Sequence, residues 1–438
     1  MTPEFSISTA WTSANFGPPE IRETSGQLSI QLGNHIATRA EDDWSKTVQT
    51  SVRLSAYPLA LWFVESWWRL LWEPALEGEH VTSTWRLGHD MSAAGHGFIW
   101  PRLVFESDGE NMEVTSFQST PTVTEPVRYL EGFRALTTSK AFERAVDGFI
   151  SLVVARLDAV GIRDSELHRL WQEVKDERSD PNVAEYRRIE ARLGFESDEA
   201  PEKLVDELTR LMPELGRDAV SEVAPACSGK DPEATLHMII DTAKSSGVEG
   251  KISELPKLIS VMKSSAEKSA QPWERGRKLA RLARSTLSLG SGPLSDNHFS
   301  DLLGMPSTVL SKANGTSGEL PLGLAVRGER QGDFKLVFRR HVHAGRRFEA
   351  ARFLGDSLTA PVEDKWLPST DAKTVRQKIQ RAFAAEFLCP IEALIAFLDG
   401  DYSPEASDEA GEHFAVSPIA VRSQLANHGY IHPLQVAA

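Results

Sequence analysis

Apolar residues recur at helical spacing in two stretches of the C-terminal third, behind a short strand-like run. The run Leu-Val-Phe-Arg at 336–339 predicts a strand, and the three- to four-residue spacing within 347–358 predicts a helix directly after it. A second helix is expected over 374–388, where Pro390 stops it. Its apolar stripe consists of Ile379, Ala382, Phe383 and Phe387. The pattern therefore predicts a strand followed by two amphipathic helices.

The first 135 residues show short apolar runs separated by turn residues, which predicts a mixed α/β domain. The turn Ser-Asp-Gly-Glu at 107–110 predicts a hairpin. Residues 59–72 are too densely apolar for periodicity to choose between a helix and a long buried strand. The expected strands are 27–31, 50–54, 85–87, 98–105 and 112–117.

Residues 136–265 are polar and follow helical periodicity, with breaks at proline and glycine residues. This composition is typical of helix bundles that act as spacers or docking surfaces. Together the patterns predict an α+β protein with a Trp-rich α/β domain (1–135), a helical region (136–265) and a C-terminal domain (272–438).

Two further helices with a tight turn at Val416-Ser417 are expected near the C-terminus, the second starting at Pro418. They resemble a helix-turn-helix, in which Arg422, Gln424 and Asn427 would face a DNA groove. Two packed helices with a short turn also occur widely without touching DNA. Both interpretations stay open at this point.

The composition is that of a globular protein of several domains: 438 residues, 41% hydrophobic, with a net charge of −14 that does not favour non-specific binding to nucleic acid. Cys227 and Cys389 are the two cysteines, which argues against a disulfide framework and fits a reducing compartment. No apolar run reaches the length of a membrane span, and the first residues lack the pattern of a signal peptide. We therefore expect a cytoplasmic protein that does not bind a membrane.

The two C-terminal helices carry a pair of short motifs. Residues 347–355 read Arg-Phe-x-x-Ala-x-x-Leu-Gly and residues 383–390 read Phe-Ala-Ala-Glu-Phe-Leu-Cys-Pro. This pair resembles the ImmA/IrrE family of metallopeptidases, and the likeness extends over about residues 272–431, from a basic helix that starts at Pro272 to the last helix pair. The resemblance implies a zincin-like domain and a bacterial setting of stress response, mobile elements or phage defence.

The sequence departs from that family where the zinc chemistry would lie. A zinc peptidase needs two histidines one turn apart and a glutamate beside the first, but these places hold Arg352, Phe353 and Asp356. The acidic ligand expected near Gln377 is also missing. We therefore predict no catalytic residue, no metal and no cofactor, and a vestigial pocket formed by Arg352, Phe353, Asp356, Gln377 and Glu386.

Three alternatives concern what fills the vacated position. Arg352 and Asp356 stand at i,i+4 and form either an ion pair in the place of the metal, with Glu386 nearby, or a weak exposed pair. His341 and His343 on one strand face offer a residual metal site as the third.

The Gly-rich connection at 85–101 carries the chemically suggestive residues of the N-terminal domain. Arg86, His89, Asp90 and His96 form a possible pocket that would bind a metal or move a proton, although glycines also serve turns. The nearby tryptophans either build a core or line a ligand pocket. They are Trp62, Trp67, Trp68, Trp72, Trp85 and Trp100.

A possible basic contact patch for DNA phosphates or an acidic partner consists of Arg339, Arg340, Arg346, Arg347, Arg376 and Arg381. Three function classes follow. The preferred one is a non-catalytic regulatory or scaffold protein that binds a partner protein through the cleft between the Arg352 and Glu386 helices. The second is a DNA-binding regulator. The third is a metallopeptidase or other hydrolase with non-standard ligands, at His89, Asp90 and His96 or at His341 and His343.

Overall fold

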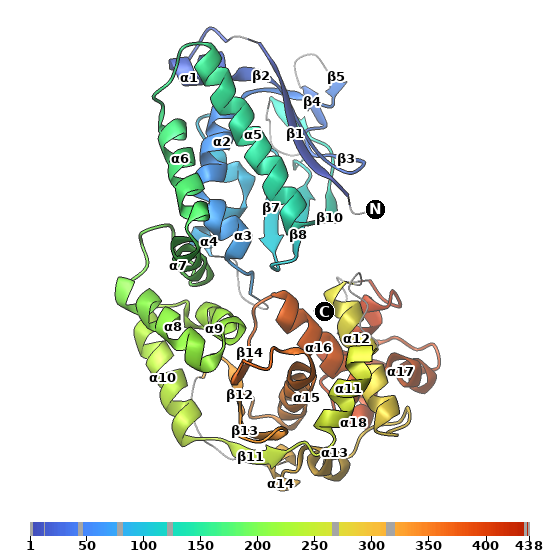
Figure 1. Cartoon of the computed structure of the whole chain (residues 1–438). Helices are drawn as coiled ribbons and strands as arrows, with labels where there is room; N and C mark the ends of the chain where they lie inside the picture. Colours follow the sequence, from blue (N-terminus) through green and yellow to red (C-terminus); the bar gives the residue numbers. More distant parts are fainter. Residues whose placement is uncertain are drawn as a thin grey trace. The chain divides into compact units, whose positions relative to one another are not determined.

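The computed structural model of the chain describes residues 3–12, 14–42, 47–76, 82–120, 126–264, 271–311, 320–432 and 436. The chain folds into two compact units, Met1–Val205 and Asp206–Ala438 (Figure 1). Helices and antiparallel strands occur in both units, which confirms the mixed class expected from the sequence. The helical region expected at 136–265 is divided by the boundary at Val205.

The first unit contains groups of strands and helices up to β10, followed by helices alone. Its elements are β1 (Phe5–Trp11), α1 (Pro19–Glu23), β2 (Ser25–Leu32), β3 (His35–Ile36), β4 (Ala40–Asp42), β5 (Thr47–Gln49), β6 (Val52–Ser55), α2 (Ala56–Glu65), α3 (Trp67–Trp72), α4 (Ser83–His89), η1 (Met91–Ala94), β7 (Arg102–Ser107), β8 (Asn111–Phe117), β9 (Val127–Tyr129), β10 (Phe133–Thr138), α5 (Ser139–Ala159), α6 (Glu166–Ser179) and α7 (Pro181–Arg192). Helix α8 (Glu202–Leu215) contains the boundary.

Three small antiparallel sheets and helix α5 build this unit. Strand β2 pairs with β1, β3 and β6, while β8 lies between β7 and β10, and β4 lies between β5 and β9. The β7–β8 hairpin is formed as predicted, because the Asp108 carboxylate accepts from the backbone N–H of Asn111 at 2.7 Å and Gly109 has a φ of +99°. Helix α5 packs on β1 and buries its apolar face (Figure 1).

The core of the first unit is aromatic. The rings of Phe5, Phe63, Phe105 and Phe142 contact one another at centroid distances of 5.2 to 6.3 Å. Trp62, Trp67, Trp68 and Trp100 are buried in the same cluster, so the interpretation of these tryptophans as core residues is confirmed.

Two expected strands are wrong or shorter than predicted. Residues 85–87 lie in helix α4, whose N-terminus is capped by the Thr82 hydroxyl accepting from the Trp85 N–H at 3.1 Å. The strand expected at 98–105 begins only at Arg102. The apolar run at 59–72 forms two helices, α2 and α3, that meet at Ser66.

The second unit surrounds one four-stranded sheet with helices. Its elements are α9 (Arg217–Val223), η2 (Ala224–Cys227), α10 (Pro232–Ser245), β11 (Val248–Lys251), α11 (Leu255–Ser264), α12 (Pro272–Thr286), α13 (Asp296–Leu303), α14 (Thr308–Ser311), β12 (Gly323–Arg327), β13 (Asp333–Val337), α15 (His343–Thr359), β14 (Trp366–Ser369), α16 (Val375–Leu388), α17 (Ile391–Leu398), α18 (Pro404–Phe414) and α19 (Pro418–Asn427). The strand order is β11-β13-β12-β14, and all pairs are antiparallel.

The predicted helices are present as α15 and α16, but the strand expected at 336–339 overlaps β13 only at Leu336 and Val337. His341 and His343 do not share a strand face as expected, because β13 ends at Val337 and His343 is the first residue of α15. Helices α12, α15 and α16 approach closely because glycines face the contact. A Cβ on Gly355 would lie 2.7 Å from the Phe383 ring, and one on Gly276 would lie 2.5 Å from the Ile379 carbonyl oxygen. These helices therefore fix the residues between them with little freedom.

Among the helices of the described ranges, none is both long enough and apolar enough to cross a lipid bilayer.

Candidate functional site

Arg352 lies inside the second unit and binds neutral oxygens. It projects from α15, is 4% exposed, and donates to the Thr370 carbonyl oxygen at 2.7 Å. It also donates to the side-chain oxygens of Gln377 and Gln380 on α16. Gln377 in turn accepts from the Thr370 N–H at 3.0 Å, so its amide is fixed from two sides. The position expected for a metal ligand is thus a guanidinium among amide and carbonyl oxygens.

Asp356, one turn further along α15, is held by Arg376 of α16. Two parallel hydrogen bonds of 2.9 and 2.8 Å join this arginine to the buried carboxylate, and a third of 2.6 Å goes to Asp364. Burial lowers the pKa of Arg376. The carboxylates of Asp356, Glu222 and Asp364 have a larger effect in the other direction, so the pKa of Arg376 lies above its usual value. The expected partner of Asp356 was Arg352, and the structure gives this bidentate role to Arg376 instead.

A third carboxylate, Glu222 of α9, closes the network from outside the two helices. Its Oε2 accepts from the Thr374 hydroxyl at 2.8 Å and from the Gln377 amide at 3.0 Å. Burial raises the pKa of Glu222, and Arg376 offsets only part of that effect. The sequence analysis assigned no role to this residue, since it is about 150 positions away from its partners.

The chain before α9 fits tightly against the loop that carries Asp364. Gly216 has a φ of +105°, and a Cβ on it would lie 2.5 Å from the Asp364 Cα. The Lys365 N–H donates to the Leu215 carbonyl oxygen at 2.9 Å, which occupies the start of edge strand β14. The segment from Leu215 to Glu222 therefore covers the network that Arg352 and Arg376 form. We call these groups, Arg352, Asp356, Asp364, Arg376, Gln377, Gln380 and Glu222, the closed network.

Phe353 and Glu386 lie elsewhere in the second unit. Phe353 packs against Phe334 of β13 in the apolar core, with ring centroids 4.4 Å apart. Glu386 accepts from Arg281 of α12 at 2.8 Å and from the Gln424 amide of α19 at 3.0 Å. The predicted vestigial pocket is thus brought together in part: Arg352, Asp356 and Gln377 share the closed network, whereas Phe353 and Glu386 have other partners.

The chemistry available in the second unit is limited. A guanidinium cannot bind a cation, and each carboxylate of the closed network already accepts hydrogen bonds from arginine, threonine or glutamine. Burial raises the pKa of both thiols, Cys227 and Cys389, to about 12. Throughout the described ranges, no three His, Cys, Asp or Glu side chains gather as metal ligands would. His343, one of the two histidines considered as ligands, bonds Asp296 at 2.8 Å.

The six arginines of the expected contact patch do not share an exposed face. Arg346 and Arg347 are buried: the first stacks on Phe338, and the second binds Asp296 and the carbonyl oxygens of Leu294 and Ala415. Arg376 belongs to the closed network. Arg339 donates to Asp371 at 2.7 and 2.8 Å, and Arg381 donates to the Ala372 carbonyl oxygen. Arg340 keeps a mostly exposed side chain, at 53%.

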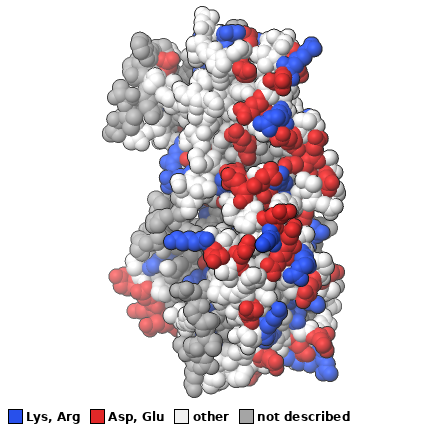
Figure 2. All heavy atoms as spheres, turned by 90° about the vertical axis from the view of Figure 1, so that its left-hand side faces the viewer, with Lys and Arg blue, Asp and Glu red and all other residues white. Residues whose placement is uncertain are grey.

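The surface carries both signs of charge. Figure 2 shows Asp and Glu side chains interspersed with Lys and Arg on one face of the molecule, in keeping with the acidic net charge. On the face drawn, this mixture of charges does not favour the phosphate backbone of DNA.

Helices α18 and α19 form the expected C-terminal pair, joined through Ala415, which has a φ of +52°. Gln424 does not face outward as predicted for a DNA-reading residue. It is buried and donates to Glu386 and to the Cys389 carbonyl oxygen, because α19 packs on α16 through this side. The interpretation of Gln424 as a groove residue is therefore wrong.

The four candidate residues of the first unit are separated by the fold. His89 is buried at the end of α4, where Trp85 stacks on its ring at 4.1 Å. Asp90 accepts from Arg102 at 3.1 Å and from Ser92, while the side chains of Arg86 and His96 are exposed. The predicted pocket of Arg86, His89, Asp90 and His96 is therefore not a single site.

His89 belongs instead to a buried network with Arg69 and Glu73. Its Nδ1–H donates to the Phe105 carbonyl oxygen at 3.0 Å, and its Nε2 lies 2.9 Å from Glu73 Oε2. Both ring nitrogens therefore face oxygens, and the imidazole is held from two sides. Arg69 donates to Glu73 at 2.6 Å and also to Glu196. The i,i+4 spacing of Arg69 and Glu73 within an apolar run was the sequence signal for this network.

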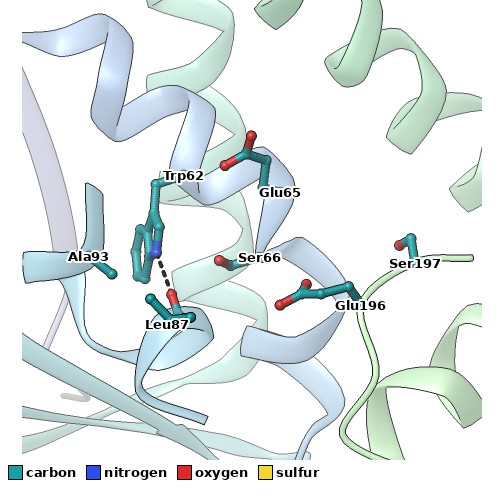
Figure 3. A pocket seen from close by; sticks show the side chains of 7 residues that line it. All are labelled: Trp62, Glu65, Ser66, Leu87, Ala93, Glu196 and Ser197. Carbon is teal, nitrogen blue, oxygen red and sulfur yellow. Dashed lines mark hydrogen bonds between the residues drawn. The ribbon is translucent and has the colours of Figure 1, made fainter. Parts of the chain in front are cut away.

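A hollow of about 420 Å³ lies next to these groups, at the end of α2 (Figure 3). Glu196 belongs to the Arg69 network, because its side chain accepts from Arg69, and it also lines the hollow. Leu87 and Ala93 of the segment 85–101 form part of the wall, so this segment borders a pocket through residues other than those predicted. The lining residues are Trp62, Glu65, Ser66, Leu87, Ala93, Glu196 and Ser197.

Comparison of the sequence with protein-family models and with curated proteins, and of the structure with solved structures, finds no match. The residues and their contacts alone therefore bear on the function.

Proposed function

We propose that this chain is a non-catalytic regulatory or scaffold protein whose second unit is a degenerate metallopeptidase-like domain that binds a partner protein. The observation that carries the proposal is the closed network. At the positions where the resembled family has its zinc ligands and general base, Arg352 binds amide and carbonyl oxygens, Phe353 packs in the core and Asp356 holds Arg376. None of these groups is available to activate a water molecule.

The burial of the closed network changes where a partner is expected to bind. Arg352, Gln377 and Glu386 are all buried, so a partner cannot contact them at the proposed cleft between α15 and α16. Leu215 also occupies the start of strand β14, one of the two outer strands of the sheet. Addition of a peptide strand at that edge is therefore not favoured.

The C-terminal helices offer a better surface because they expose aromatic side chains. Phe397 of α17 is 40% exposed and stacks on His413 of α18 at 4.4 Å. Tyr430 is 44% exposed and lies 5.6 Å from the Tyr402 ring. Exposed aromatic rings that are already held by a neighbour bury a large area at little entropic cost, which is why they are common at protein interfaces. We therefore place the partner surface on α17 to α19.

The absence of catalysis is tested with the purified full-length protein and added zinc. We expect no hydrolysis of a quenched-fluorescence peptide library above the protein-free rate, and no change with Arg352→Ala. Hydrolysis that stops on chelation and returns with zinc would contradict the proposal. Mass spectrometry of the cleaved peptides would then identify the specificity.

The partner surface is tested by crosslinking and quantitative mass spectrometry in the source cells. The double variant Phe397→Ala/Tyr430→Ala is expected to reduce the yield of specific partners by about tenfold, as loss of two aromatic anchors does in other interfaces. Val362→Ala is the matched control, because Val362 is an exposed apolar residue of the same unit outside α17 to α19. Equal yields from the double variant and the control would exclude this surface.

The resemblance to ImmA/IrrE proteins suggests a bacterial stress or phage-defence setting, and the partners are expected to belong to such systems. A DNA-binding function has less support, since the arginines expected to form its contact patch are mostly paired or buried. A DNA affinity that falls steeply with salt concentration would favour that function instead.

A further inference from the structure

The hollow of the first unit combines two carboxylates, a buried hydroxyl and an apolar wall (Figure 3). We propose that it binds an alkylammonium or guanidinium group, either of a free amine or of a lysine or arginine side chain. The nitrogen would lie at Glu196 and Ser66, with the charge of Glu65 on the same lining, and the carbon chain would lie against Trp62 and Leu87. This proposal does not rest on the function proposed for the second unit, because all of its residues belong to the first.

The two carboxylates supply the charge that such a group needs. Glu196 uses Oε1 to accept from Arg69, and within the described ranges no hydrogen bond reaches its other oxygen. Glu65 is the last residue of α2 and forms no ion pair with any described residue. Both side chains line the hollow (Figure 3). No lysine, arginine or histidine is among the described residues that line it.

Ser66 is the independent sign of a missing partner. The residue is 4% exposed and lines the hollow, and its hydroxyl has no hydrogen-bond partner among the residues described. Its backbone N–H bonds the Trp62 carbonyl oxygen at 2.9 Å, which fixes the residue at the end of α2. Because Ser66 lines the hollow, its hydroxyl oxygen can accept a hydrogen bond from an N–H donor that enters there.

The wall favours an organic cation over a metal ion. Trp62 is held in place by its indole N–H, which donates to the Leu87 carbonyl oxygen at 2.8 Å (Figure 3). Its ring, Leu87 and Ala93 present apolar surface against which methylene groups can pack. A volume of about 420 Å³ is wide for a bare ion, and it lies within the range of pockets that hold small organic groups.

The electrostatics of Glu65 agree with an incoming positive charge. Burial raises the pKa of Glu65, and the neighbouring carboxylates of Glu166 and Glu196 raise it further, while His96 acts in the opposite direction. A cation next to Glu65 would relieve this repulsion. Binding is therefore expected to release protons and to strengthen as the pH rises through the titration of Glu65.

The test uses isothermal titration calorimetry on the full-length protein with two probes. Agmatine represents a free amine, and the peptide Ac-Gly-Arg-Gly-amide represents a side chain of a partner. The same peptide with norleucine in place of arginine is the uncharged control. We expect at least one charged probe to bind with a Kd below about 1 mM and the control peptide not to bind.

Single substitutions locate the site. Glu65→Gln is expected to weaken binding of the charged probe about tenfold, and Ser66→Ala about threefold, as loss of an ion pair and of one hydrogen bond would. Glu199→Gln is the matched control, because Glu199 is exposed on the same segment as Glu196 but does not line the hollow. It should change the Kd by less than about twofold. Thermal melting of each variant confirms that it is folded.

The outcomes separate the two sources and decide the proposal. Tighter binding of agmatine supports a free amine, and tighter binding of the peptide supports a side chain of a partner. Absence of binding for both probes at about 10 mM overturns the proposal. Binding that Glu65→Gln leaves unchanged in a folded protein overturns it as well.

Discussion

Each unit buries arginine side chains, and the two networks differ in the groups that surround the guanidinium ions. In the first unit Arg69 faces two carboxylates, Glu73 and Glu196, and Glu73 also contacts His89. In the second unit Arg352 donates to the Thr370 carbonyl oxygen and to two glutamine side chains, while Arg376 donates to the carboxylates of Asp356 and Asp364. Amide and carbonyl oxygens therefore supply hydrogen bonds to Arg352, whereas two carboxylates hold Arg376 directly.

The networks also differ in their access to solvent. Glu196 is partly exposed and lines the hollow, so a ligand can reach the first network without unfolding of the unit. In the second unit Asp356, Asp364 and Glu222 are all buried, and the last of these belongs to the segment that covers the others. Charges that cannot reach water are costly to leave unpaired. We call the network of Arg69, Glu73, His89 and Glu196 in the first unit the open network. We therefore expect the closed network to govern stability and the open network to govern binding.

The largest expected effect comes from removing one charge of the closed network. Asp356→Ala leaves Arg376 buried with one of its two carboxylates, and the second unit should lose about 3–5 kcal/mol of unfolding free energy. Glu196→Gln, the matched change in the open network, should cost less than about 1 kcal/mol because its side chain is partly exposed. Urea-dependent hydrogen exchange of peptides from each unit measures both. Equal losses would show that the two networks do not differ in this way.

A smaller loss is expected when the covering segment is forced outward. Gly216→Ala introduces a Cβ at a φ of +105° and 2.5 Å from the Asp364 Cα, so it should cost about 2–3 kcal/mol. The hydrogen exchange of α9 and β14 should increase as well. Gly229→Ala is the control, since no heavy atom lies within 4 Å of its new Cβ. A wild-type unfolding curve for Gly216→Ala would show that this contact is not needed for closure.

Glu222→Gln tests the same closure through pH. Burial raises the pKa of Glu222, so the folded protein binds its proton more tightly than the unfolded chain does. Binding of this proton adds to the free energy of unfolding. The contribution is fully present below the unfolded pKa of about 4.3, and it is lost as the pH rises through the raised folded pKa of Glu222. A glutamine at this position does not titrate, and its side-chain oxygen can still accept from the Thr374 hydroxyl.

The variant should therefore melt about 2–4 °C higher than the wild type at pH 8, which corresponds to about 1 kcal/mol for a unit of this size. The difference should shrink towards pH 4. Calorimetric scans between these pH values measure it. A variant that melts lower than the wild type at pH 8 would mean that the Glu222 charge, paired with Arg376, is itself stabilising.

The amphipathic helices of the second unit could be predicted from the sequence, since local signals mark them. Thr374 caps α16 by accepting from the Gln377 N–H, and Gly304 ends α13 in the left-handed conformation. The strand expected at 85–87 was wrong because three residues, Trp85, Arg86 and Leu87, are too few to define a period. The capping Thr82 was the competing local signal.

The partners of the buried polar residues could not be predicted, because they come from distant parts of the chain. Arg347 binds Asp296 and the Ala415 carbonyl oxygen, which are 51 and 68 positions away. Sequence patterns treat arginine as a surface residue, and periodicity cannot identify an acceptor from another element. Gln424 was misplaced for the same reason, since Glu386 of α16 determines which side of α19 is buried.

The smallest expected effect concerns Asp371, a carboxylate at the rim of the second unit whose pH dependence has the opposite sign to that of Glu222. Burial opposes its ionisation, but the hydrogen bonds and charge of Arg339 outweigh that and lower the pKa of Asp371. The unfolded chain therefore binds this proton more tightly than the folded protein does. Stability from the pair is present above the unfolded pKa of about 3.9 and is lost as the pH falls through the lowered folded value.

Asp371→Asn should destabilise the second unit at pH 7 by less than about 1 kcal/mol, since the side chain is 38% exposed and the pair is screened. The difference from the wild type should disappear once the pH falls below the lowered folded pKa of Asp371, and it should shrink in high salt. Paired melts of the Asp371→Asn and Glu222→Gln variants across pH measure both signs in one unit. If both variants changed stability in the same direction at pH 8, burial would not be what distinguishes a rim carboxylate from a covered one.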